Sequence, residues 1–377
     1  MVHHGSKGYD EAASAAAENA REKLGALIEK GRVRAGAVLE QVERQMPRDR
    51  VVAAPVIRFD VGDDNGRLGM ALGGNVRAWI HDHALGQACE RVGVPWKYAQ
   101  ELRNRGIWGG ELAAHNLNEL LEHQPGARYL LRAIEVENGD EEVRGFLSDR
   151  YRRLDSRPIV EAFGTAAAKV GAVPVEGYAL ETKIAIKALL PRVFEPVPNE
   201  VMAFGVMLSN SDFGDGALSL RCFMLRLFCT NYAITDEALR QVHLGGALPS
   251  DVAFSDRTYR LDTQRSASMI LDVVGGELAP ERINAACDLV RRANEERIEG
   301  GAVGAFLKKH LGVGDADQVT EAFSSADVEN LPPGQSTWRL SNAISWVAGN
   351  TKDEAKRLEL MKVAALALPG LGRLHRN

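Results

Sequence analysis

The 377-residue sequence predicts an α+β fold, in which a central mixed or antiparallel sheet is backed by a helix and flanked by helical N- and C-terminal regions. Three observations support this prediction. Apolar residues recur at helical spacing in the first 46 residues, short apolar runs between turn residues fill the middle of the chain, and helical spacing returns from about Leu261.

The composition is that of an ordinary globular protein. Hydrophobic residues make up 45% of the chain and charged residues 26%, so enough apolar material is present for a core. The net charge of -5 argues against a generally basic surface that coats nucleic acid, and any phosphate-binding face must therefore be local. No apolar run is long enough to span a bilayer, because Arg221 and Arg226 interrupt the most apolar stretch, Leu218 to Ile234.

The four cysteines are Cys89, Cys222, Cys229 and Cys287, and their spacing fits no metal site. Cys222 and Cys229 should point to opposite faces of one strand, so they are expected to pack in the core without forming a disulfide. Nothing before the fold resembles a secretory signal. These features predict a cytoplasmic protein with no membrane partner and no cofactor.

The N-terminal part of the chain is expected to contain two regions. Residues 1–50 form a helical arm, which its glycines weaken and which should be peripheral to the core, so that deletion through Met46 leaves a folded body. Residues 51–125 form a hairpin, with strands over 51–59 and 69–72, and then a helical subdomain. Three helices are expected there, with Asp82 capping the first of them.

Two further regions complete the chain. Residues 126–275 form the central α+β domain, and residues 276–377 form a C-terminal helical region. The backing helix of the central domain should run from Arg157 to Val170, because Pro158 suits a first helical turn and Gly171 ends the pattern. The strands expected in this domain are residues 129–136, 143–147, 178–190, 201–209 and 217–230.

A family resemblance rests on three stretches and one late element. The stretches are Asp82-His83-Ala84 with Gly86, Gln87, Gly93, Pro95, Tyr98 and Leu102; Phe146 to Arg152 with Leu154 and Asp155; and Leu208 to Ser211 with Gly214, Leu220, Arg221 and Cys229 to Asn231, while the late element is Trp338 with Asn342 to Ile344. The chain in this respect resembles a family of uncharacterised phage and plasmid proteins, grouped as the domain of unknown function 932.

The resemblance covers the chain from about Ile80 to the C-terminus and leaves the N-terminal arm outside. It implies a protein of a mobile genetic element with a single α+β body, in a bacterial, archaeal or phage-infected cell. It supplies no catalytic residues. Ser156 departs from the family pattern, which often has Asn at that turn.

A cluster of basic and aromatic residues gives the candidate site. Interleaved arginine and aromatic side chains at a strand-to-helix junction can follow a phosphate backbone while a ring stacks on a base. An alternative interpretation is a solvated edge, where arginine stems cover apolar surface and pair with acidic residues. The candidate nucleic-acid-binding residues are Arg144, Arg150, Tyr151, Arg152, Arg153 and Arg157, with Arg221 and Arg226 extending the set unless their opposite strand parity separates them.

Other motifs are weak. His81 and His83 stand two residues apart, which on a helix places them on different sides and argues against a shared metal. Ser148, Asp149 and His243 lack the turn and the base that a nucleophilic serine needs. The glycine pairs lack the phosphate-binding patterns of nucleotide sites.

These observations favour a phage-type or plasmid-type accessory protein that binds nucleic acid, preferably single-stranded DNA, without catalysis, in annealing or recombination. One alternative is a structural or assembly protein that associates through its N-terminal arm and C-terminal helices, as a homo-oligomer. Another is an enzyme whose site is assembled from residues far apart in the sequence.

Overall fold

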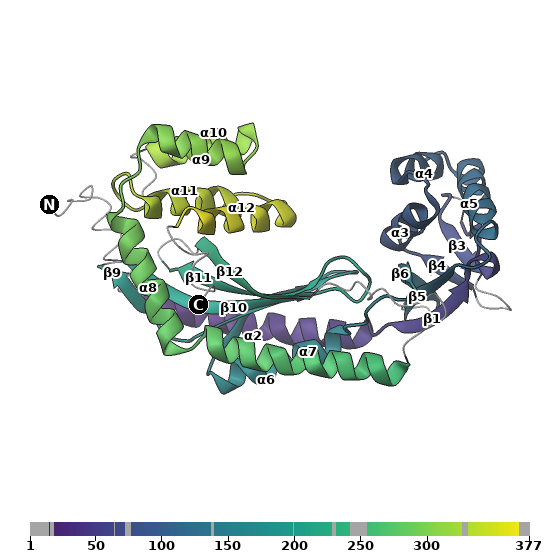
Figure 1. Ribbon diagram of the computed structural model, residues 1–377, viewed down its shortest axis with the longest axis horizontal. Helices are drawn as coiled ribbons and strands as arrows, with labels where there is room; N and C mark the ends of the chain where they lie inside the picture. The colour runs from purple at the N-terminus through teal and green to yellow at the C-terminus, as the bar shows by residue number, and fades with distance from the viewer. Residues whose placement is uncertain are drawn as a thin grey trace.

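The computed structural model contains two six-stranded sheets, each covered by helices (Figure 1). It confirms the α+β class predicted from the sequence. The described residues are 15, 19–63, 65–71, 77–136, 139–198, 200–227, 231–241, 255–325 and 331–368, with the backbone alone described for 231–241, 354, 355 and 358.

Sheet A lies on the right of Figure 1 and is covered on one face by three helices. All its pairings are antiparallel except that of β4 with β6. Apolar side chains from the sheet and the helices, such as Phe59, Leu85 and Leu117, share one core. The strand order is β1 (Arg48–Ala53), β5 (Arg128–Glu135), β6 (Glu141–Ser148), β4 (Arg77–Ile80), β3 (Leu68–Ala71), β2 (Arg58–Val61), and the helices are α3 (Asp82–Val92), α4 (Trp96–Arg103) and α5 (Ile107–Glu122).

Sheet A differs from the prediction in two ways. The strand expected over 51–59 is two strands, because Pro55 lies in a short 3-10 turn, η1 (Ala54–Val56), and cannot donate to a ladder. β1 and β2 consequently lie at opposite edges of the sheet. The boundary expected after residue 125 falls inside the sheet, because β5 and β6 join the earlier strands, while the hairpin of β2 with β3 is confirmed.

Sheet B is antiparallel and has helices on both faces (Figure 1). Even-numbered residues of its long strands, such as Phe204, face one helical layer, and odd-numbered residues, such as Phe223, face the other. The strands are β7 (Val173–Ala179), β8 (Ile184–Leu189), β9 (Phe194–Val197), β10 (Glu200–Asn210), β11 (Leu218–Arg226) and β12 (Asn231–Gln241).

The helices of sheet B lie on both of its faces (Figure 1). α6 confirms the predicted backing helix, and the helical C-terminal region is also confirmed. The single strand expected over 178–190 is instead the β7–β8 hairpin, and β9 and β12 were not predicted. One face carries α6 (Ser156–Lys169), α7 (Asp256–Glu277) and α8 (Pro280–Glu295). On the other face α11 (Thr337–Gly349) and α12 (Glu354–Leu366) contact the sheet, and α9 (Gly300–His310) and α10 (Val313–Ser324) are stacked above them.

The helix α2 (Ala20–Arg44) packs along β7, the edge strand of sheet B. Leu24 belongs to the core beneath α11 and α12, whereas Val38 and Val42 belong to the core beneath α6 and α7. The expectation that this segment is peripheral is therefore wrong. Its glycines weaken the local pattern, but the apolar side chains bury against a sheet that the sequence could not place beside them.

At Gly31, the backbone of α2 closely approaches the backbone of β7. A Cβ atom at this position would lie 2.2 Å from Val175 Cα and 2.5 Å from the Pro174 carbonyl oxygen, both of them backbone atoms. A Cβ atom at Gly36, in the same helix, would meet nothing within 4 Å.

Substitution of these two glycines should change stability in opposite directions. Gly31→Ala forces α2 away from β7 and should cost about 1–3 kcal/mol of unfolding free energy. Gly36→Ala removes only the entropic penalty of a helical glycine and should add about 0.5–1 kcal/mol. Urea unfolding measures both, and equal effects of the two changes would contradict the close contact.

Within the described residues, no helix combines the length and the apolar character needed to cross a bilayer.

Candidate functional site

The loop between β6 and α6 holds most of the predicted basic cluster, and its arginines form internal ion pairs. Arg152 makes two hydrogen bonds to Asp262 of α7, one of them 2.6 Å long from Nη2 to Oδ1. Arg153 reaches Asp256 of α7 (3.1 Å) and Asp49 of β1 (3.3 Å). These two arginines therefore fix α7 against the loop.

Three other members of the predicted cluster also have internal partners. Arg144 is buried and donates to Glu142 Oε2 (2.8 Å), while Arg157 is half-exposed and donates to Glu161 Oε1 (3.1 Å). Tyr151 is 7% exposed, and burial raises the pKa of its phenol. Its ring packs in the core, whereas base stacking would require an exposed ring.

Arg150 differs from its neighbours. It is partly exposed, and within the described part of the chain it makes no ion pair or hydrogen bond. It is the member of the predicted cluster that remains available to a phosphate.

Arg221 and Arg226 lie on opposite faces of β11, as their parity predicted. Arg226 donates two 2.6 Å hydrogen bonds to Glu200, and the side chains of Arg226 and Glu200 are both buried. Arg221 lies opposite Met207 of β10 in the strand register, and Met207 is an odd-numbered residue on the face covered by α11. Neither arginine shares a surface with the loop that carries Arg150, so the eight predicted residues do not form one face.

A basic row that was not predicted from the sequence lies on the first three turns of α7. Arg257, Arg260 and Arg265 are exposed, and among the described residues no carboxylate pairs with any of them. The residues between them on this face are Leu261 and Gln264, which carry no charge. At 1.5 Å per residue, the row is about 12 Å long.

The same turns of α7 carry two acidic residues, and both are neutralised from the loop. Asp256 pairs with Arg153 and Asp262 with Arg152, on the sides of the helix that flank its buried face. The outward face is left with an excess of positive charge. The next acidic residue on this face is Asp272, about 10 Å farther along the helix.

A local signal for the row was present in the sequence. A helix capped by Ser255, whose hydroxyl oxygen accepts from the Thr258 N–H, places the three arginines on one side. The helical region predicted from apolar spacing begins only at Leu261, so Arg257 and Arg260 lie outside it.

The histidines at the start of α3 connect the two sheets. His81 caps α3, because its Nδ1 accepts from the His83 N–H (3.1 Å), and its Nε2 contacts Glu181 (2.7 Å), which lowers the pKa of that carboxyl. Asp82 is not the cap as expected; it pairs with Arg103 at 2.6 Å. Within the described residues, no three potential metal ligands lie together.

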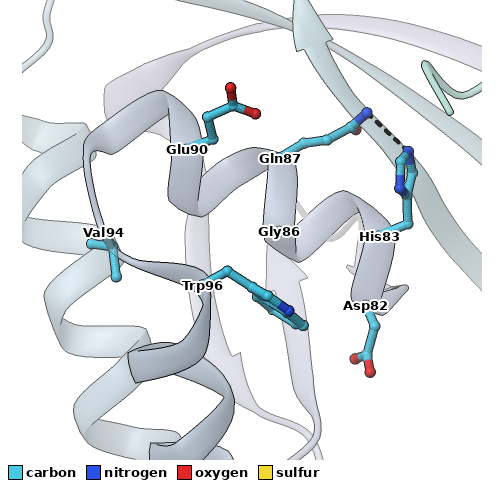
Figure 2. Close-up of a pocket in the computed structure, with 7 residues that line it drawn as sticks. All are labelled: Asp82, His83, Gly86, Gln87, Glu90, Val94 and Trp96. Carbon is cyan, nitrogen blue, oxygen red and sulfur yellow. Dashed lines mark hydrogen bonds between the residues drawn. The ribbon is translucent and has the colours of Figure 1, made fainter. Parts of the chain in front are cut away.

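A cavity of about 670 Å³ lies along α3 (Figure 2). Its polar side chains are largely occupied by structural contacts. His83 and Gln87 contact the Phe213 carbonyl oxygen at 3.1 and 2.9 Å, and Gln87 also accepts from the Phe146 N–H. His83 and Gln87 are therefore placed by hydrogen bonds that connect the two sheets, and their positions do not require a ligand.

The other weak motifs add no site. The Ser148 carbonyl accepts from the Tyr151 N–H in a turn, and His243 lies outside the described residues, as do Gly73, Gly74 and Cys229. Cys89 and Cys287 are buried, and burial raises the pKa of each thiol, to about 11 for Cys89. Neither thiol has the environment of a reactive nucleophile.

The contact between the two sheets centres on Arg132 of β5, which is 1% exposed. Its Nε donates to Asp49 (2.8 Å), its Nη2 to Asp155 (2.5 Å) and its Nη1 to the main-chain oxygen of Asp212 (2.7 Å). We call Arg132, Asp49, Asp155, Asp212 and Ser156 the junction. Beside the junction, Asn210 of the third family-like stretch donates to the Leu154 carbonyl oxygen of the second stretch (2.7 Å) and to Ser156 Oγ (3.1 Å), which gives Asn210 a structural role.

No protein-family model, curated protein or solved structure matches this chain. The resemblance to phage and plasmid proteins stays a prediction.

Proposed function

We propose that this protein binds nucleic acid through the phosphate backbone, using the outward face of α7 together with Arg150, and performs no covalent chemistry. The observation that carries the proposal is the row of Arg257, Arg260 and Arg265 on the outward face of α7, where the residues between them on that face, Leu261 and Gln264, carry no charge. In the mobile-element setting that the resemblance implies, the partner would be single-stranded DNA, for annealing or recombination.

The chemistry of the row supports a phosphate partner. A guanidinium group presents several N–H donors in a rigid plane and matches phosphate oxygens, and its charge does not titrate in the physiological range. Because Arg152 and Arg153 neutralise Asp262 and Asp256, the field outside this face is positive although the whole chain carries -5. Arg152 and Arg153, which were predicted to contact phosphate themselves, thus act indirectly, because they hold α7 and α7 presents the arginines that would contact phosphate.

The proposal predicts a change in salt dependence when the row is removed. In the variant Arg257→Ala, Arg260→Ala, Arg265→Ala, the slope of log K against log salt for single-stranded DNA should become shallower by about 2, since each phosphate contact contributes about 0.7. Fluorescence anisotropy at several salt concentrations measures the slope. The melting temperature should stay close to that of the wild type, because the three side chains are exposed.

A matched control removes the same charge elsewhere. Arg21, Lys30 and Arg34 are exposed on α2 and, among the described residues, have no ion-pair partner. Their triple alanine variant should keep the wild-type slope. Equal slopes for the α7 variant and the wild type would contradict the proposed interface.

A second candidate, an assembly protein, is favoured by one observation. Tyr98, Ile107, Trp108 and Leu112 on α4 and α5 are 46%, 46%, 55% and 38% exposed. Large apolar side chains gathered on one surface are typical of protein contacts. A folded wild-type protein that binds neither single-stranded nor double-stranded DNA at low salt would favour this surface and this function.

A further inference from the structure

The loop between β10 and β11 reaches from sheet B onto sheet A. Gln87 and His83 hold the carbonyl of Phe213, and a Cβ atom at Gly145 of sheet A would lie 3.4 Å from the Phe213 backbone. Gly214 has φ +82°, a left-handed conformation that glycine permits without strain. The loop therefore packs against sheet A, and Asp212 is buried in this contact.

Asp212 takes over the helix-capping position that Asp155 leaves unfilled. Its carboxylate accepts from the N–H of Ser156, the first residue of α6, at 2.7 Å. Asp155 is the N-cap residue by position, but its side chain makes no capping hydrogen bond and pairs with Arg132 instead. One end of a helix in the sheet B layer is thus capped by a loop that also contacts sheet A.

The charges around Asp212 are unbalanced. None of the three donating nitrogens of Arg132 makes a hydrogen bond to the Asp212 carboxylate. They donate to Asp49 of β1, to Asp155 before α6, and to the main-chain oxygen of Asp212. Arg153 offsets Asp49 from the other side, and the phenol of Tyr151 also faces the junction. The Asp212 carboxylate therefore has no guanidinium of its own, and Asp155 adds a second negative charge beside it.

We propose that Asp212 is a proton-operated latch between the two sheets, closed most firmly when its carboxyl group is protonated and loosened when it is ionised. The latch is independent of nucleic-acid binding. It sets how tightly the β10–β11 loop and the start of α6 are held on sheet A.

The pH range follows from the environment of the carboxyl group. Burial raises the pKa of Asp212 to about 6, Arg132 lowers it, Asp155 raises it, and the hydrogen bonds of Ser156 lower it. Because the folded-state pKa lies above the usual Asp value of 3.8, the ionised form weakens the folded junction. This weakening is present above about pH 6 and disappears as the pH falls toward the unfolded-state value.

Hydrogen exchange across pH tests the latch in the wild-type protein. After correction for the intrinsic exchange rate, protection of the Ser156 amide and of the 211–216 loop should fall by several-fold as the pH rises from 5 to 7.5. In Asp212→Asn, which retains an oxygen acceptor for the Ser156 N–H but carries no charge, protection should stay high and nearly constant over the same range.

A control variant lies in the same loop. Asp215 accepts from the Thr182 hydroxyl at 2.7 Å, and Asp215→Asn should keep the wild-type pH profile. A wild-type profile that is flat between pH 5 and 7.5 would overturn the latch, and so would an Asp212→Asn variant that folds and shows the wild-type pH dependence. The wild-type profile alone decides if the Asp212→Asn variant does not fold.

Discussion

A chain that lacks residues 1–46 should fail to form a soluble, cooperatively folded protein. The deletion removes α2, whose Leu24, Val38 and Val42 are buried in the two cores of sheet B, and it exposes the edge of β7. Each large buried apolar side chain contributes about 1.5–3 kcal/mol, and whole domains are stable by only about 5–15 kcal/mol. Circular dichroism melts and solubility at equal expression measure the result.

Adding α2 back as a separate peptide provides the control. A peptide of residues 19–46 should restore a cooperative melt, whereas the same peptide with Leu24, Val38 and Val42 changed to Ser should not. A truncated chain that melts like the full protein would show that α2 is peripheral, as the sequence alone predicted.

Arg132→Met should destabilise the protein by about 3–5 kcal/mol at pH 7, the cost of breaking a buried ion pair from one side. The change keeps an apolar side chain in the space of Arg132 but leaves Asp49 and Asp155 without their hydrogen-bond donor. Urea unfolding at pH 7 measures the loss.

Arg48→Met on β1 is the matched control. Arg48 pairs with Glu135, but both side chains are about half exposed, at 55% and 52%. Its loss should cost less than about 1 kcal/mol because water screens the pair. An Arg132 variant as stable as this control would contradict a central role for the junction.

Local patterns in the sequence predicted the local features of the fold well. Strand alternation correctly separated Arg221 from Arg226, and Pro158 correctly marked the start of α6. Where a run of apolar residues contained two elements, as in β7 and β8, periodicity alone did not show the turn between them. The close contact of Gly31 with β7 was hidden because it joins residues more than 140 positions apart.

The candidate site was harder to predict, because the partners of its arginines lie far away in the sequence. Arg152 and Arg153 contact Asp262 and Asp256, more than 100 residues later, and no spacing rule connects these positions. A count of nearby acidic residues therefore overestimated the free positive charge of the loop. Arg132 gave a usable signal, since a charged residue within the apolar run of β5 requires partners in the folded protein.

The salt dependence of oligonucleotide binding by the wild-type protein tests the central claim most directly. If Arg150, Arg257, Arg260 and Arg265 each contact one phosphate, log K for single-stranded DNA should fall linearly with log salt, with a slope of about -3. The slope should not depend on base sequence, because phosphate contacts do not read bases. A protein that binds neither single-stranded nor double-stranded DNA at low salt would contradict the account.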